Sequence, residues 1–160
     1  MRAAWGRTGA LVLSLLVPVR AARLPCKVYT SADGLPNNHA TAVLHDSRGL
    51  VWIGTTEGLA RFDGTRFRTY DTRDGLPHPA ITSLAETRDG TLWAGTESGL
   101  CRLLPKRENG RLFDCHAPGP DQADRAVLAL FEDSRGGLWL GTNSGVFRDG
   151  MRRPVPGGMR

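Results

Sequence analysis

Three cysteines and four histidines are the residues of this 160-residue chain whose types could carry chemistry. Cys101 and Cys115 flank Asn109-Gly110, a dipeptide typical of tight β-hairpin turns. The midpoint of the two cysteines is residue 108, within that turn region, so the pair would face each other on neighbouring strands. In an oxidising compartment we predict a Cys101–Cys115 disulfide, with two free thiols as the alternative, and we assign no partner to Cys26.

The histidines could supply metal ligands or a general base, because imidazole titrates near neutral pH. They are His39, His45, His78 and His116. No zinc-type spacing of Cys and His occurs, no carboxylate stands at a defined spacing from a histidine, and nothing identifies an activated serine. We therefore predict solvated loop histidines, no metal site, no cofactor and no catalytic residue, so that this chain is not an enzyme.

Recognition of a ligand is a separate possibility, because loops at one end of a scaffold commonly bind partners. Asn37, Asn38, His39 and His78 follow short Gly-Leu-Pro loops and could face such a site. The alternative is that Asn37 and Asn38 hydrogen-bond their own turns. The sequence leaves both alternatives open and assigns no ligand-binding residue.

The elements that must position these residues recur three times along the chain. Each copy has a turn, then Trp-x-Gly-Thr, then a second Gly, with the tryptophans at 52, 93 and 139. The spacings are 41 (93 − 52) and 46 (139 − 93) residues. A period in the forties, carried by strand-forming residues and glycine-rich turns, is typical of β-propeller blades.

Each repeat can be divided into four short strands, which in the first copy are residues 42–45, 50–55, 58–62 and 66–70. Residues 50–55 are apolar on both faces, so both faces of that strand must be covered by neighbours. Gly54, Gly95 and Gly141 each follow the tryptophan by two and share its face. We expect these glycines to let the next sheet approach beside the indole.

The connections between blades also repeat. Asp-Gly-Leu-Pro occurs at 33–36 and again at 74–77, and the same offset of 41 places Tyr29 over Tyr70. The segment around Tyr29 is therefore predicted to be the outer strand of a blade preceding the first repeat. The third repeat has no such loop, and residues 105–124 are predicted to form an enlarged blade loop.

Together these patterns predict an all-β fold, a partial β-propeller of about three four-stranded antiparallel blades around Trp52, Trp93 and Trp139. We assign residues 22–150 to the propeller and 151–160 to an irregular tail. Because closed propellers have about four to eight blades, three blades leave free faces and strand edges. We expect a fragment of a longer protein, with self-association through the open edges as a further possibility.

Residues 1–21 have the organisation of a secretory signal peptide, which places the mature chain in the periplasm or outside the cell. An uncleaved N-terminal anchor is the alternative. The whole chain has 21 basic and 16 acidic residues, and loss of Arg2, Arg7 and Arg20 leaves 18 against 16, or about +2. This small excess argues against a nucleic-acid partner.

The motifs Asp-Gly-Leu-Pro-Asn-Asn at 33–38 and Gly-Leu-Val-Trp-Ile-Gly-Thr-Thr-Glu-Gly-Leu at 49–59 resemble the two-component regulator propeller repeat of bacterial sensors. The resemblance implies the extracytoplasmic sensing part of an inner-membrane histidine kinase or diguanylate cyclase, usually with two seven-bladed propellers. It also implies a small-molecule or carbohydrate ligand, and a membrane connection only through a missing C-terminal part.

Two other classes stay open. Residues 87–93 are similar to the Asp-box turn of propeller glycosidases, so a fragment of a propeller enzyme acting on polysaccharide, a lyase or glycosidase, is one alternative. A bare protein-interaction scaffold is the other. No membrane helix after the signal, kinase phosphoacceptor motif, nucleotide-binding glycine loop or cyclase signature is recognisable in the sequence.

Overall fold

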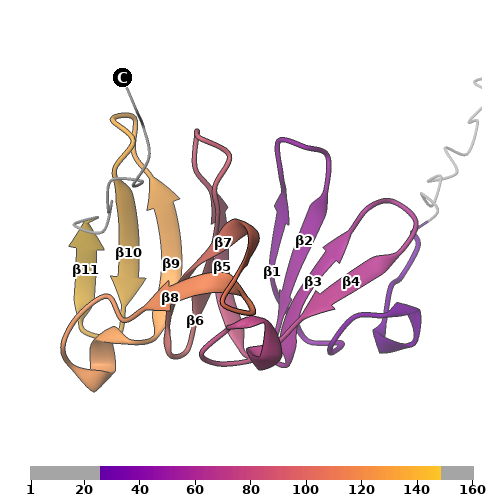
Figure 1. Ribbon diagram of the computed structural model, residues 1–160, viewed down its shortest axis with the longest axis horizontal. Helices are drawn as coiled ribbons and strands as arrows, with labels where there is room; N and C mark the ends of the chain where they lie inside the picture. Colours follow the sequence, from indigo (N-terminus) through magenta and orange to yellow (C-terminus); the bar gives the residue numbers. More distant parts are fainter. Residues whose placement is uncertain (1–25, 149–160) are drawn as a thin grey trace, which may run out of the picture.

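The computed structural model describes residues 26–148, so the predicted signal peptide 1–21 and tail 151–160 lie outside the described residues. The described chain forms three antiparallel sheets that follow one another along the sequence and stand side by side (Figure 1). We call them blades 1, 2 and 3. The predicted all-β, propeller-type arrangement around Trp52, Trp93 and Trp139 is confirmed.

The strands of each blade run in sequence order across its sheet. Blade 1 contains β1 (Ala40–His45), β2 (Val51–Thr55), β3 (Gly58–Phe62) and β4 (Phe67–Tyr70). Blade 2 contains β5 (Ile81–Glu86), β6 (Leu92–Thr96), β7 (Gly99–Glu108) and β8 (Arg111–His116). Blade 3 contains β9 (Val127–Glu132), β10 (Leu138–Thr142) and β11 (Gly145–Arg148), so it has three strands rather than four within residues 26–148. One 3-10 turn precedes each blade: η1 (Ser31–Asp33), η2 (Thr72–Asp74) and η3 (Gln122–Asp124).

The repeated Gly-Thr pair builds the turn between the second and third strands of each blade. In blade 1 the Thr55 hydroxyl donates to the Gly58 carbonyl at 2.8 Å and accepts from the Glu57 N–H at 3.2 Å. Gly58 has φ +152°, a conformation that a side chain would disfavour. Thr96 and Thr142 make the same pair of bonds in blades 2 and 3. One threonine hydroxyl thus satisfies two backbone groups of a tight turn.

Two apolar clusters join the three blades. The first contains Trp52 and Leu59 of blade 1 with Ile81 and Phe113 of blade 2, all nearly inaccessible to solvent. Tyr70 connects them, stacking on Trp52 with ring centroids 5.7 Å apart and meeting Phe113 edge-on at the same separation. The second cluster lies between blades 2 and 3 and contains Leu100, Val127, Leu138 and Leu140. The core is therefore between blades, not within one.

The glycine after each tryptophan marks where the next blade approaches. A Cβ on Gly54 would lie 2.7 Å from Cγ2 of Ile81 on β5. A Cβ on Gly95 would lie 2.7 Å from the Val127 carbonyl oxygen on β9. At Gly141 the nearest atom is Cβ of Ala129 in the same sheet, at 3.4 Å. The predicted role of these glycines is confirmed at the two junctions that the described chain contains.

Two sequence-based expectations were wrong in detail. Residues 105–124 are not one enlarged loop, because β7 continues to Glu108, turns at Asn109-Gly110 and returns as β8. Asn109 and Gly110 both have positive φ, 49° and 81°, which allows a two-residue hairpin turn here. Residues 26–30 form no strand, since no neighbouring strand is available to pair with them in the described chain. Tyr29 instead packs against Phe62 and Phe67.

Each blade has two faces and two edges. The forward face looks to the following blade and carries the tryptophan and its glycine, and the backward face looks to the preceding blade. We use 'corner edge' for the end of each blade at which the chain turns from the first strand to the second; these ends lie at the top of Figure 1. The connection edge holds the 3-10 turns, at the bottom.

Candidate functional site

The connection edge gathers the polar residues that the sequence singled out as candidates for ligand recognition. Its framework is set by carboxylates that close each 3-10 turn. In the second connection Asp71 accepts from the Arg73 N–H at 2.8 Å, and Asp74 accepts from the Asp71 N–H at 3.2 Å. The turn ends at Gly75, with φ +109°. These bonds fix where the chain enters the next blade.

Asn37 and Asn38 use their side-chain oxygens locally. Asn37 Oδ1 accepts from the His39 N–H at 2.7 Å, and Asn38 Oδ1 accepts from the Ser31 N–H at 2.7 Å. The expectation that they bond their own turns is therefore met by the oxygens of both side chains. All three of Asn37, Asn38 and His39 remain at least partly exposed.

His78 is the equivalent of Asn37 in the second connection and has the same local role. Its Nδ1 accepts from the Ala80 N–H at 3.1 Å, which leaves Nε2 pointing to Glu97, 3.6 Å from Oε2. Glu97 lies in the turn between β6 and β7 and donates its N–H to the Ala80 carbonyl at 3.3 Å. A half-buried imidazole and a carboxylate thus share the connection edge.

Asp124 occupies the same repeat position in the third connection, which the sequence did not reveal. It is 4% exposed, accepts from the Asp121 N–H at 3.1 Å and receives a hydrogen bond from Ser144 in the turn between β10 and β11. The same position of the repeat is therefore occupied by Asn37 in the first connection, His78 in the second and Asp124 in the third. Counting back 15 residues from each tryptophan would have found the set.

The other two histidines do not join this edge as a group. His45 ends β1 at the corner edge and is exposed, while His116 ends β8 opposite Leu100. Among residues 26–148, no group of three or more His, Cys, Asp or Glu side chains is arranged to hold a metal ion. The connection edge offers amide, imidazole and carboxylate groups, which suit hydrogen bonding to a hydroxyl-rich or polar molecule.

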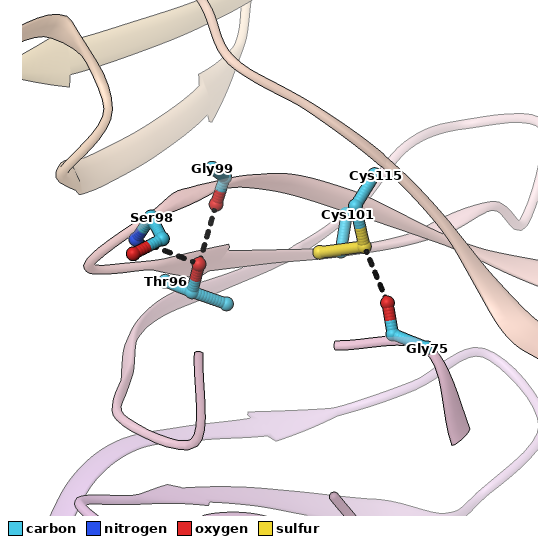
Figure 2. The surroundings of a disulfide bond; sticks show 6 residues. All are labelled: Gly75, Thr96, Ser98, Gly99, Cys101 and Cys115. Atoms are coloured by element: carbon cyan, nitrogen blue, oxygen red, sulfur yellow. Dashed lines mark hydrogen bonds between the residues drawn. A yellow bond between two sulfur atoms is a disulfide. The ribbon is translucent and has the colours of Figure 1, made fainter. Parts of the chain in front are cut away.

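Cys101 and Cys115 lie directly opposite each other on β7 and β8, with Cα atoms 4.1 Å apart and sulfurs 2.15 Å apart (Figure 2). Cys115 Sγ lies 3.4 Å from the carbonyl oxygen of Gly75. This is a contact rather than a hydrogen bond, because a bridged sulfur carries no hydrogen. Cys101 is inaccessible to solvent, and Cys115 lies beside Gly75 of the second connection. The bridge therefore links β7 to β8 at the place where this hairpin meets the connection. Cys26 is exposed and free.

The Cys101–Cys115 disulfide remains a prediction that mass spectrometry of the unreduced chain can test. Alkylation without reduction should modify Cys26 alone, and digestion should release one linked peptide pair containing Cys101 and Cys115. The bridge closes a loop of 14 residues, so replacing both cysteines by alanine should lower the free energy of unfolding by about 3 kcal/mol. Alkylation of Cys101 or Cys115 in the unreduced protein would contradict the pairing.

The corner edge is built around the tryptophans. Asp46 Oδ2 accepts from Trp52 Nε1 at 2.9 Å, while Oδ1 accepts from the N–H groups of Arg48 and Leu50 at 3.0 and 2.8 Å. Asp133 bonds Trp139 in the same way at 2.9 Å. In blade 2 the Thr87 hydroxyl takes the role, accepting from Trp93 Nε1 at 3.3 Å. The Asp-box-like sequence is thus a structural turn.

Two features of this edge were not found from the sequence. A glutamate ends the first strand of blades 2 and 3 and accepts from the preceding blade, Glu86 from the Ser47 N–H and Glu132 from the Arg88 N–H, both at 2.8 Å. An arginine also stands opposite each tryptophan on the third strand: Arg61, Arg102 and Arg148. In the sequence, an arginine nine residues after each tryptophan is the pattern that would have revealed this set.

Acid should weaken the blade 1 corner. Burial raises the pKa of the Asp46 carboxyl, but hydrogen bonds from Trp52, Leu50 and Arg48 outweigh it and lower the pKa to about 2, from 3.8. Because the folded pKa is the lower one, this stabilisation is complete above about pH 4 and is lost as the pH falls towards about 2. Its size is about 2 kcal/mol.

Urea unfolding between pH 2 and 6 measures this contribution. Asp46→Asn should be less stable than the parent above about pH 4, and the two curves should converge near pH 2. The comparison isolates Asp46, because other carboxylates with a lowered pKa, such as Asp133, are present in both proteins. A constant difference at all pH values would show that ionisation of Asp46 is not the cause.

Sequential antiparallel blades that bury a tryptophan face against the next blade define an arc of a β-propeller. Three segments of the chain, residues 34–57, 75–98 and 121–144, match the two component regulator propeller family. The chain belongs to this family through these three repeats.

Solved structures with similar folds come from two groups of proteins. The extracellular domain of the putative hybrid two component system BT3049 from B. thetaiotaomicron gives a TM-score of 0.60 at 20% identity, covering 74% of this chain and 16% of that one. The extracellular domain of the putative one component system BT4673 from the same organism gives 0.56 at 29%, covering 66% and 14%. A catalytically inactive virginiamycin B lyase from Staphylococcus aureus gives 0.53 at 17%, covering 75% and 44%.

These likenesses differ in what they show. Those to BT3049 and to the lyase are below 25% identity and show the fold alone. This chain spans only a small part of the two extracellular domains, 16% of the first and 14% of the second. Comparison with curated proteins finds no significant match. No helix within residues 26–148 is long and apolar enough to cross a membrane.

Proposed function

We propose that this chain is the ligand-sensing propeller region of an extracytoplasmic signal-transduction protein. The observation that carries the proposal is the match of all three repeats to the two component regulator propeller family. The likeness to the BT4673 extracellular domain at 29% identity supports it. In this proposal the chain lies in the periplasm or is secreted through residues 1–21, and residues 22–150 form the propeller part.

The polar groups of the connection edge are the proposed ligand-binding surface. Asn37 and His78 recur at one position of successive blades and are partly exposed, so a molecule lying along that edge would meet hydrogen-bonding groups at a regular spacing, whereas the Asp124 carboxylate at the third such position is buried and bonded to Asp121 and Ser144. A carbohydrate or another small polar molecule suits such a series, because its hydroxyl groups both donate and accept. The lyase likeness is one of fold, so we propose no catalytic step.

Binding can be tested by thermal unfolding of the exported chain in the presence of a panel of neutral and acidic disaccharides. At least one sugar should raise the melting temperature, because it binds only the folded state. His78→Ala should lower the affinity about tenfold, and His45→Ala at the opposite edge should leave it unchanged. A panel without effect, or equal losses in both variants, would overturn this assignment of the surface.

The output part of the proposal is tested separately. A histidine kinase or diguanylate cyclase should be encoded in the same reading frame as this chain, after further Trp-x-Gly-Thr repeats and a membrane helix. Sequencing of the coding region downstream of Arg160 gives the answer. A reading frame without a membrane helix and an output domain would contradict this part of the proposal and leave the binding test unaffected.

A further inference from the structure

The arginine opposite the tryptophan is paired with a carboxylate in blades 2 and 3. Arg102 on β7 donates to Asp114, its partner on β8, at 3.0 Å. Arg148 donates to Asp133 at 3.1 Å. A guanidinium group keeps its positive charge at every physiological pH, so a carboxylate beside it balances that charge.

Blade 1 has a second arginine where blade 2 has Asp114. Arg61 on β3 lies directly opposite Arg68 on β4, in the register that joins arginine to aspartate in blade 2. Both arginines lie on the forward face with Trp52, because paired residues of neighbouring strands share a face. Like charges at directly opposite positions of a sheet repel each other. The outer half of blade 1 therefore holds two adjacent positive charges.

Each of the two guanidinium groups lies over an aromatic ring. Arg61 Cζ is 6.0 Å from the centroid of the Trp52 ring, and Arg68 Cζ is 5.3 Å from that of the Tyr70 ring. The two rings stack on each other and are almost inaccessible to solvent. The face of an aromatic ring attracts a cation without using its N–H groups. One aromatic stack thus positions both arginines and leaves their donors available.

Within the part of the chain that the structure describes, no carboxylate pairs with either arginine. Arg61 Nε is inaccessible to solvent and has no hydrogen-bond partner there. Asp46 is the blade 1 equivalent of Asp133, but it accepts from Arg48 at 2.9 Å instead. Glu86 of blade 2 accepts from Ser47 through both of its oxygens. A buried donor without an acceptor costs free energy, which a bound acceptor would recover.

We propose that Arg61 and Arg68 bind a doubly charged oxyanion, a phosphate or sulfate group. Two guanidinium groups balance two negative charges, and their planar N–H groups match the oxygens of such a group. Arg68 is exposed and Arg61 is half-buried, so the group enters from solvent. A free ion and an ester of a larger molecule share this chemistry. The site lies at the register of Trp52, away from the connection edge, and is independent of the ligand proposed there.

Calorimetric titration of the full chain with inorganic phosphate tests the proposal, at low ionic strength and at about pH 8, where phosphate is close to doubly charged. The parent chain should bind one phosphate. Arg61→Gln and Arg68→Gln should each weaken binding about tenfold, the loss expected for a hydrogen-bonding charged group. Arg102→Gln is the matched control, because it removes an arginine from the same position of blade 2 and should leave the affinity unchanged within about twofold.

A second titration, with glucose 6-phosphate, distinguishes the two sources of the group. Tighter binding of the ester than of inorganic phosphate would support a group carried by a larger molecule, and equal or weaker binding would support the free ion. Acetate carries a single charge and should bind at least tenfold more weakly than phosphate. Acetate binding as tight as that of phosphate would contradict a site for a doubly charged group.

Arg68→Asp provides the converse experiment, because it recreates in blade 1 the ion pair of blade 2. Without phosphate and at low ionic strength, this variant should melt about 2–5 °C above the parent, since attraction replaces repulsion. Phosphate should raise the melting temperature of the parent but not that of the variant. The proposal would be overturned by a parent that binds no phosphate, by equal losses in Arg61→Gln and Arg102→Gln, or by an Arg68→Asp variant that still binds phosphate or is less stable than the parent.

Discussion

Replacing Trp52 by alanine should lower the free energy of unfolding by about 3–5 kcal/mol, the cost typical of deleting a fully buried large aromatic side chain. Trp52 is 0% exposed, stacks on Tyr70 and lies between blades 1 and 2. The substitution also removes the indole N–H that Asp46 accepts, which leaves a buried carboxylate with fewer donors. Since small domains are stable by only about 5–15 kcal/mol, this single change removes a large part of the total.

The repeat supplies its own control. Trp139 has the same place in blade 3 and the same bond to an aspartate, but it is 37% exposed on the free forward face. Trp139→Ala should therefore cost only about 1 kcal/mol in urea unfolding. Equal losses at the two positions would contradict the conclusion that stability arises at the junctions between blades.

The second large effect is expected at Gly95. A Cβ there would lie 2.7 Å from the Val127 carbonyl oxygen and 3.0 Å from its Cγ1, so blades 2 and 3 would have to separate. Gly95→Ala should lower the free energy of unfolding by about 1–3 kcal/mol, as is usual for overpacked cores. Neighbouring side chains can rotate, but a backbone carbonyl in a strand cannot move independently of its sheet.

Gly141→Ala is the matched control for this substitution. The added Cβ would meet only Ala129, at 3.4 Å, which is ordinary contact. With no clash within the described chain, alanine should change the free energy of unfolding by no more than about 0.5 kcal/mol, and a small increase is expected because alanine restricts the unfolded chain. Urea titrations of both variants make the comparison, and a destabilised Gly141→Ala would count against an open forward face on blade 3.

Much of the fold was predictable because the repeat places strong local signals in phase. The apolar strand around each tryptophan, the Gly-Thr turn and the Asn109-Gly110 hairpin each depend on residues close in sequence. The turn alone would not set Cys101 opposite Cys115, because Glu108 pairs with Arg111 and a regular ladder from there would place Pro118 opposite Cys101. The observed pairing depends on a register shift between Leu103 and Glu108 that the sequence did not reveal. The length of β7 was missed, since residues 105–108 do not alternate clearly between apolar and polar.

The candidate site was less predictable. The sequence singled out Asn37, Asn38, His39 and His78, and the structure places all four in the connections ahead of the blades. It could not show that the two asparagine oxygens serve local turns, nor that Asp124 is buried and bonded to Asp121 and Ser144. The third connection lacks the Gly-Leu-Pro motif, so in the sequence only its distance from Trp139 relates Asp124 to Asn37 and His78.

The sequence alone determined the all-β repeat, the number of tryptophan-centred blades within it and the family to which they belong, because these depend on short motifs that specify strands and turns. Tertiary structure decided which tryptophan of the three similar repeats is fully buried, which glutamates connect neighbouring blades and which blade faces are exposed within the described chain. The physical reason is that a side chain on the face of one blade is buried only when a second blade packs against that face. Identical motifs acquire different energies according to whether another sheet lies against them.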